Sequence, residues 1–386
     1  MFLKNLRLIN FRNYINFEQN FNHLKTIIIG QNAQGKSNIL EAVNILATSQ
    51  SERAERDSEL ILWTKDHALI FADIEVKDSK LDIALQINST GRRKLKINGV
   101  NKKAPQADLV GNFFAVMFSC EDLYLIKGSP LTRRRCLDSI LFQLDLKYHK
   151  LIQDYQKAVT QKNALLKNAR ETSMPRKELK EQVEIWNEQI INLGTEIVFT
   201  RIHFIDEIEP LARDFLNNIS KGTENLGLTY KSTIYEGEDN YPYLQDKTNI
   251  RKQFLASLNE SFDEELARGQ CVIGPHRDDL TFLINKKEAK SFASQGQQRS
   301  IVLAIKLAEL KIIEKRKDEI PVLLLDDVFA ELDESRQDFL LHNLPEKIQT
   351  FLTTTHISDI QKEFLRGAEV LEVKDGKVLE NTKCKT

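Results

Sequence analysis

The sequence is poor in cysteine and contains no long apolar segment. Its 386 residues include four cysteines, none of them in a C-x-x-C pair: Cys120, Cys136, Cys271 and Cys384. This scarcity argues against a disulfide framework or a zinc site, and a reducing cytoplasm fits it best. No stretch approaches the roughly 18 apolar residues of a membrane-spanning helix, and the first residues lack the apolar core of a signal peptide. We therefore expect a soluble, cytoplasmic protein.

An excess of charge of either sign is also absent. Lys and Arg together number 55 and Asp and Glu number 56, so the formal net charge is -1. That balance gives no overall attraction to nucleic acid, and any contact with DNA must use a local basic surface. The length is sufficient for two or three domains with a sizeable core.

The spacing of apolar residues predicts an α/β protein. Strands are expected within residues 1–30, including a buried run at 26–29, and a helix should follow from Lys36. Alternating residues from 68 to about 100, with turn signals at 88–91 and 98–99, predict an antiparallel sheet. In the C-terminal part we expect a helix from about Gln297 to Arg316 and strands at 322–325 and 350–354. The polar tail after Gly376 is expected to fray.

The middle of the chain predicts an antiparallel helical hairpin. Apolar residues recur at spacings of three and four from 137 to 155 and from 179 to 197, around a break at 173–175. Each arm should be about 45–50 Å long at 1.5 Å per residue. A projecting coiled coil and two amphipathic helices packed on a globular lobe both remain open. We expect domains at 1–128 and 269–386, forming one α/β head, with an inserted helical lobe at 129–268.

Residues 30–37 fit the phosphate-binding pattern G-x-x-x-x-G-K-[ST]. They read Gly30-Gln31-Asn32-Ala33-Gln34-Gly35-Lys36-Ser37 and stand between a β-branched run and an amphipathic helix, as the pattern requires. The glycines let backbone N–H groups turn toward the phosphates, and the following helix adds its positive N-terminal end. Lys36 would bridge the β- and γ-phosphates of ATP, and Ser37 would ligate Mg²⁺.

A predicted buried strand ends in two adjacent carboxylates, Asp326 and Asp327. Buried acids are costly unless they are paired or bound to a metal. We therefore assign Asp326 to Mg²⁺ and Asp327 to the orientation or polarisation of an attacking water molecule. The alternative is that these acids cap a helix.

Two further segments match ABC-type ATPases in order. Residues 294–299, with Ser294, Gly296 and Gln297 as candidate nucleotide contacts, precede a helix and resemble the signature that holds a γ-phosphate. Residues 330–333 resemble the D-loop. His356 stands where these ATPases place a γ-phosphate-sensing histidine, and Arg12 resembles an arginine that approaches nucleotide in SMC-like proteins. Both could equally be ordinary surface charges, and the glutamine of a Q-loop has no clear counterpart.

The order of the motifs, with roughly 260 residues between phosphate loop and signature, resembles the SMC-like DNA-maintenance ATPases. Within that group the sequence resembles the RecF family. The matching segments are LRLINFRNY at the start and residues 118–123, 127–135, 274–280, 293–299 and 325–333. Cys120 stands where this family usually has proline, and Ala33 replaces a glycine common in the superfamily. Asp327 occupies the place where most ABC ATPases have glutamate, and its shorter side chain predicts slow hydrolysis.

The resemblance implies an ATP-dependent DNA-binding protein of recombinational repair and replication restart. Such a protein would use ATP and Mg²⁺ as a weak, DNA-stimulated ATPase. Its ATP-driven homodimer would clamp double-stranded DNA near single-strand gaps or junctions, release it after hydrolysis, and support recombinase loading and the SOS response. The implied partners are RecR and, through it, RecO. A non-hydrolysing ATP-gated binding module and a transporter ATPase subunit are the alternatives.

Clusters of basic residues are the candidates for DNA contact. Arg133, Arg134 and Arg135 follow Ser129-Pro130, a predicted helix start where cations oppose the helix dipole. Arginines together with helix N–H groups would hold a phosphate, although an acidic partner within the protein is the alternative. Further candidates on the predicted antiparallel sheet are Arg92, Arg93 and Lys102.

Overall fold

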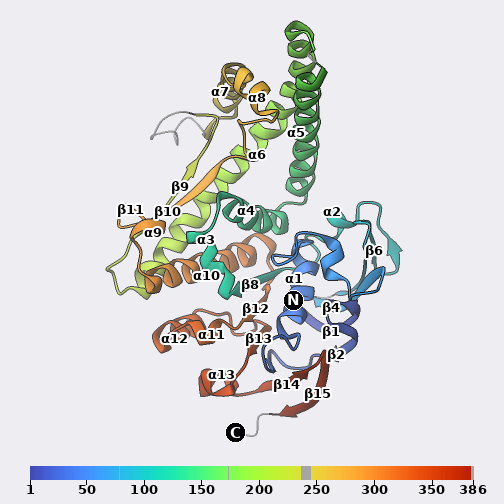
Figure 1. Cartoon of the computed structure of the whole chain (residues 1–386). Coiled ribbons are helices and arrows are strands. Elements are labelled where there is room, and N and C mark those ends of the chain that lie inside the picture. The colour runs from blue at the N-terminus through green and yellow to red at the C-terminus, as the bar shows by residue number, and fades with distance from the viewer. Residues whose placement is uncertain (78, 173, 236–244, 384–386) are drawn as a thin grey trace. The chain divides into compact units, whose positions relative to one another are not determined.

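The computed structural model describes residues 1–77, 79–172, 174–235 and 245–383, which form two compact units (Figure 1). The first unit contains residues 1–123, 142–146 and 299–386, and the second contains 124–141 and 147–298. Residues 269–298, which we grouped with the C-terminal part of the head, therefore cluster with the second unit. No helix in the described part of the chain is long and apolar enough to cross a membrane.

The first unit contains a six-stranded antiparallel sheet, as the alternating pattern predicts. Its strands, in the order β2-β1-β4-β5-β6-β7, are β1 (Phe2–Phe11), β2 (Tyr14–Asn20), β4 (His67–Val76), β5 (Ser79–Asn88), β6 (Arg93–Ile97) and β7 (Val100–Asn101). Alternate residues of β4, such as Ile70 and Ile74, are buried. Asn98 and Gly99 both adopt positive φ in the turn between β6 and β7, the geometry that an Asn-Gly pair favours.

The second sheet of this unit carries the predicted motifs. Its order β15-β14-β3-β13-β12-β8 comprises β3 (Lys25–Ile29), β8 (Ala115–Ser119), β12 (Val322–Asp326), β13 (Thr350–Thr354), β14 (Ala368–Lys374) and β15 (Lys377–Lys383). All neighbours pair in parallel except β14 and β15. The expectation that the tail after Gly376 frays is wrong, because this polar segment forms the edge strand β15. Edge strands tolerate polar side chains while the backbone still pairs.

Helix α1 (Lys36–Thr48) is buried along nearly its whole length, with eleven of its thirteen residues buried. One hydrophobic cluster contains its Ile39 and Leu40 together with Leu8 of the antiparallel sheet and Leu324 of the parallel sheet. The start of α1 is therefore fixed by the core of the unit. The shorter helices here are η1 (Asp57–Leu60), α2 (Pro105–Leu109), η2 (Cys120–Leu123), α11 (Val328–Glu331), α12 (Glu334–His342), η4 (Ile357–Asp359) and α13 (Lys362–Leu365).

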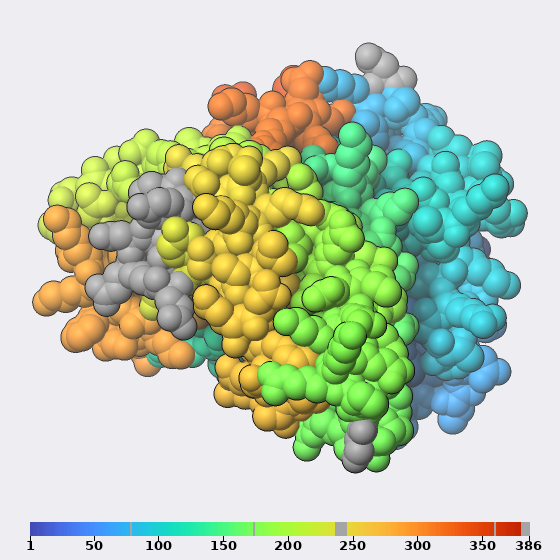
Figure 2. All heavy atoms as spheres, turned by 90° about the horizontal axis from the view of Figure 1, so that it is seen from above, coloured from blue at the N-terminus to red at the C-terminus, as the bar shows by residue number. Residues whose placement is uncertain are grey.

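The second unit is built around the predicted hairpin, α5 (Leu146–Thr172) and α6 (Arg176–Ile219). Leu166 of α5 packs with Val183 of α6 and with Phe262 of α8. In Figure 2 the gold surface of α7 and α8 lies against the green surface of the hairpin, so these helices form a packed lobe. The remaining elements are α3 (Tyr124–Lys127), α7 (Lys247–Glu260), α8 (Phe262–Arg268), α9 (Ala289–Phe292), β9 (Leu226–Lys231), β10 (Asp279–Ile284) and β11 (Lys287–Glu288).

Two long helices complete the chain, α4 (Pro130–Leu144) and α10 (Gln295–Lys317). The first apolar series, from 137 to 155, is interrupted at Asp145 between α4 and α5, which the heptad spacing does not reveal. The predicted helix at 297–316 is confirmed as α10. The β9, β10 and β11 strands form a separate three-stranded sheet.

Candidate nucleotide site and signature segment

The phosphate-binding loop joins β3 to α1, and its two glycines are required by the backbone. A Cβ on Gly30 would lie 2.3 Å from the carbonyl oxygen of Val373. Gly35 has a φ of 113°, which side chains rarely adopt, and a Cβ there would meet Asn13 and the hydroxyl of Tyr14. Ala33 takes a left-handed φ of 64° despite its Cβ, so this departure from glycine costs roughly 1 kcal/mol.

Segments from distant parts of the chain hold the loop. Asn13 donates from Nδ2 to the carbonyl of Gln34 at 2.9 Å, and the hydroxyl of Tyr14 donates to the carbonyl of Gly35 at 3.0 Å. On the other side, the N–H of Asp375 donates to Gln34 Oε1 at 2.6 Å. Since these contacts use the carbonyls and side chains of the loop, they shape it without using its glycine N–H groups.

The side chains of Lys36 and Ser37 contact the loop carbonyls and the end of β12. Lys36 is buried, and its Nζ donates to the carbonyl oxygens of Gly30 at 2.9 Å and Gln31 at 3.3 Å. A phosphate oxygen could replace these neutral acceptors and would bind the ammonium more strongly. Ser37 donates from Oγ to Asp326 Oδ1 at 2.7 Å, which joins the loop to the end of β12.

Hydroxyl groups from two other elements donate to Asp326. Its Oδ1 also accepts from Thr353 Oγ1 at 2.7 Å, and the strand register places it beside Thr353 of β13 and Ser119 of β8. Mg²⁺ prefers hard oxygen ligands and is usually held by one or two protein groups together with substrate phosphates. The contact between Ser37 and Asp326 fits that requirement.

Asp327 differs from its neighbour. It has a φ of 54° at the start of α11 and its side chain makes no capping hydrogen bond, so this aspartate does not act as the helix cap that the alternative interpretation proposed. Removal from water raises the pKa of Asp327, Asp326 adds to the rise, and Lys36 opposes it. A carboxylate with a raised pKa is a better proton acceptor, which suits the predicted role beside an attacking water.

A pocket borders these groups, and its lining includes residues that we did not predict for the site. Besides Ser37, Asp326 and Asp327, its lining includes Arg53 and Glu121. Arg53 follows α1, and Glu121 lies in η2, directly after the β8 strand that pairs with β12. Only the pairing of β8 with β12 brings Glu121 here, and no sequence pattern encodes that pairing.

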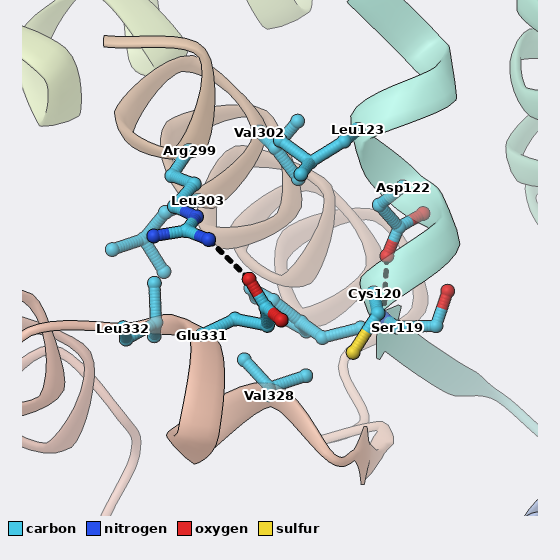
Figure 3. A pocket seen from close by; sticks show the side chains of 11 residues that line it. Ser119, Cys120, Asp122, Leu123, Arg299, Val302, Leu303, Val328, Glu331 and Leu332 are labelled. Atoms are coloured by element: carbon cyan, nitrogen blue, oxygen red, sulfur yellow. Dashed lines mark hydrogen bonds and ion pairs between the residues drawn. The ribbon is translucent and has the colours of Figure 1, made fainter. Parts of the chain in front are cut away.

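A second pocket of the first unit is mostly apolar and lies beside η2. Arg299 of α10 and Glu331 of α11 face one another across it and form an ion pair (Figure 3). Cys120 Sγ lies 3.7 Å from the backbone carbonyls of both Asp326 and Asp327. Burial, with three nearby acids, raises the pKa of Cys120 to about 11. The cysteine that replaces proline therefore carries a protonated thiol at neutral pH.

The signature-like segment starts α10 with a capping box. The N–H of Gln297 donates to Ser294 Oγ at 3.2 Å, and the N–H of Ser294 donates to Gln297 Oε1 at 2.8 Å. This reciprocal pair satisfies two N–H groups at the helix start. Because Ser294 Oγ accepts in this pair, its own proton stays available for an external acceptor. Gly296 follows within the first turn.

Arg12 and His356 occupy different surroundings. Arg12 forms a two-pronged ion pair with Glu41 of α1, at 2.6 and 2.7 Å, and donates to the carbonyl of Glu59 at 2.8 Å. It must leave this pair to reach a nucleotide. His356 is exposed two residues after the end of β13, whose Thr353 contacts Asp326.

Arg133 and Arg93 are held inside the protein. Arg133 is buried, and its guanidinium donates to both carboxylate oxygens of Asp279 at 2.7 and 2.8 Å. Arg93 forms a similar pair with Asp57. Each guanidinium is thus engaged by an acidic partner within the protein, and for Arg133 this is the alternative to DNA contact that the sequence left open.

The other basic candidates differ in exposure. Arg134 donates to the carbonyl of Asp278 at 2.5 Å, and burial lowers the pKa of Arg134. Arg135 and Arg92 are exposed, and Lys102 is partly exposed. These last three remain candidates for DNA contact.

Comparisons with known proteins agree with this geometry. The family model described as "RecF/RecN/SMC N terminal domain" matches residues 2–378. The chain is 41% identical over 384 residues to the DNA replication and repair protein RecF of Rippkaea orientalis (strain PCC 8801 / RF-1), covering 98% of this chain and 99% of that protein. It is 42% identical over 378 residues to the protein of the same name from Thermosynechococcus vestitus (strain NIES-2133 / IAM M-273 / BP-1), covering 98% and 97%.

Solved structures show the same relationship. The recombination mediator protein RecF with ATP, of the RecFOR pathway, matches with a TM-score of 0.88 at 31% identity, covering 98% of this chain and 97% of that one. An Smc head bound to the C-winged helix domain of ScpA matches with a TM-score of 0.52 at 16% identity, covering 100% and 98%, which is a likeness of fold alone. The chain therefore belongs to the RecF family of DNA replication and repair proteins, which has the fold of the SMC-like ABC ATPases.

Proposed function

We propose that this chain binds Mg-ATP at residues 30–37 and that ATP joins two copies into a DNA clamp. The observation that carries the proposal is the direct contact between Ser37 and Asp326, beneath a loop whose glycines and Lys36 suit a triphosphate. The RecF relative solved with ATP supports the same ligand. Mg²⁺, when bound, would neutralise charge on the phosphate oxygens, with Ser37 and Asp326 as its protein ligands.

Hydrolysis follows from the groups around the γ-phosphate. Lys36 binds the phosphate oxygens, and Asp327 orients the attacking water and accepts its proton. Aspartate reaches one methylene less far than glutamate, so turnover is slow. His356 and Arg12 join the site only if the nucleotide draws them toward it, which for Arg12 requires release from Glu41.

The second half of each site comes from the other copy. Ser294, the N–H of Gly296 and the helix start at Gln297 of one protomer contact the γ-phosphate held by its partner. The capping box supports this, because it leaves the Ser294 hydroxyl proton free to donate. Bound ATP therefore stabilises the dimer, and its hydrolysis lets the two copies separate.

DNA contact then depends on local basic residues brought together in pairs. A chain with a net charge of -1 binds duplex weakly, and Arg135, Arg92 and Lys102 are its exposed or partly exposed candidates. The dimer presents two copies of each. It clamps duplex DNA near gaps or junctions, assists recombinase loading and the SOS response, and works with RecR and, through it, RecO.

A salt series of DNA binding, with and without ATP, tests the clamp. Each neutralised phosphate adds about -0.9 to the slope of log K against log[salt]. ATP should steepen the slope by several units, and a slope that does not depend on ATP would refute the clamp. Single-turnover hydrolysis separates this function from a non-hydrolysing, ATP-gated binding module.

A further inference from the structure

Both ends of the side-chain amide of Gln297 form hydrogen bonds, and the capping box explains only one of these two contacts. Its Oε1 accepts from the N–H of Ser294, while its Nε2 donates to Glu224 Oε1 at 3.0 Å. We propose that Glu224 is a positioning residue for the signature segment, which fixes the amide of Gln297 and, through it, the hydroxyl of Ser294. This inference rests on the proposed contact between Ser294 and the partner's nucleotide.

The carboxylate of Glu224 determines which way the amide of Gln297 points. An amide carries an acceptor at one end and donors at the other, and rotation by 180° exchanges them. An ionised carboxylate can only accept, so Glu224 requires the Nε2 end of Gln297 to face it. The Oε1 end must then face the N–H of Ser294, and this orientation alone completes the capping box.

Glu224 lies on a segment that is itself fixed. Between the end of α6 and the start of β9, the N–H of Glu224 donates to Ser220 Oγ at 3.1 Å. The next residue, Asn225, donates its N–H to Asn285 Oδ1 at 2.9 Å, and Asn285 Nδ2 donates to the carbonyl of Thr223 at 3.2 Å. These hydrogen bonds connect the turn to the β10–β11 connection on both sides of Glu224. They fix the backbone that carries the Glu224 carboxylate.

The same contact explains why residue 297 is glutamine. Glutamate is equally suited to the third helical position of a capping box, and its charge favours a helix N-terminus. Here glutamate would place a second carboxylate about 3 Å from Glu224, with no donor between them. Glutamine keeps the acceptor toward Ser294 and supplies a donor toward Glu224.

Exchanging the two side chains tests the proposal. Glu224→Gln lets the amide pair adopt either orientation, and Gln297→Glu creates the repulsion; each should weaken ATP-driven dimerisation about 10-fold. The double variant Glu224→Gln/Gln297→Glu restores one donor and one acceptor in each contact, and should return to within about 3-fold of wild type. Glu188→Gln, which changes an exposed acid on α6, is the matched control and should match wild type.

Sedimentation with ATP gives the dimerisation constants, and labelled ATP gives monomer binding, which should be the same in all five proteins. A double variant as weak as Gln297→Glu would overturn the proposal, as would single variants that dimerise like wild type. Thermal unfolding of the same proteins measures the coupling between residues 224 and 297 without nucleotide, and absence of coupling there would also overturn it. If coupling is present but wild type fails to dimerise with ATP, the proposed function fails while the positioning contact stands.

Discussion

Replacing each of the two aspartates at the end of β12, Asp326 and Asp327, by asparagine should change stability in opposite directions. The pKa of Asp327 is raised, so the folded protein binds this proton more tightly than the unfolded chain does. At neutral pH the ionised Asp327 therefore destabilises the fold, and Asp327→Asn should be more stable than wild type. The advantage should shrink as pH falls through the raised pKa, because wild-type Asp327 then becomes neutral as well.

Asp326→Asn should have the opposite effect. Ser37 and Thr353 both donate to Asp326 Oδ1 at 2.7 Å. A hydrogen bond to a charged acceptor contributes about 1.5–3 kcal/mol, against about 1 kcal/mol for a neutral one. The substitution weakens two such bonds but relieves some repulsion from Asp327. It should therefore lower the free energy of unfolding by about 1–2 kcal/mol, or Tm by roughly 2–8 °C for a unit of this size.

The two substitutions should also affect different steps, one the hydrolysis of ATP and the other its Mg²⁺-dependent binding. Asp327→Asn should bind Mg-ATP normally but lose about 10²–10⁴-fold in single-turnover hydrolysis, since a general base is removed. Asp326→Asn should weaken binding only when Mg²⁺ is present. Scanning calorimetry between pH 4 and 8, with ATP titrations with and without Mg²⁺, measures each quantity. Loss of stability in Asp327→Asn at pH 7, or wild-type hydrolysis by that variant, would refute the assigned roles.

Four other substitutions test the remaining assignments. Lys36→Met should abolish high-affinity ATP binding without unfolding the protein, and wild-type affinity for labelled ATP would contradict the loop assignment. Ser294→Arg should bind ATP as a monomer but fail to dimerise in sedimentation. Arg133→Ala should leave Asp279 without its partner and destabilise the second unit by about 3–5 kcal/mol in denaturant unfolding. Arg135→Ala should keep wild-type stability and flatten the salt slope of DNA binding, and an unchanged slope would place the DNA surface elsewhere.

Much of the nucleotide site could be predicted because its chemistry is local in sequence. The loop at 30–37 needs glycines at fixed positions, and the structure shows why at Gly30 and Gly35. A buried strand with acids at its end identifies β12, because apolar runs of that length seldom end in two carboxylates without a reason. Of the second sheet's strands, the sequence predicted β3, β12 and β13.

The rest depends on contacts that sequence spacing does not record. Arg133 meets Asp279 across 146 positions, so this acidic partner could not be predicted from the basic triplet. Asp278 is 1% exposed and accepts hydrogen bonds from Tyr230, Ser232 and Thr233. The segment at 274–280 therefore has a structural role, which its charged residues do not indicate. The strand β15 was missed for a similar reason, since its pairing with β14 satisfies the backbone whatever its side chains are.

The bond between Asp375 and Gln34 has a consequence for the order in which the site is completed. The phosphate loop is made early in synthesis, yet its supports at Val373, Asp375 and Gly376 emerge after some 340 further residues. Contacts so distant in sequence form slowly, because a long loop must close before they are gained. The nascent chain therefore passes most of its synthesis without a finished nucleotide site. We therefore expect competence to bind ATP to come late in folding, and a protein cut off before β14 to carry the whole loop motif without these contacts.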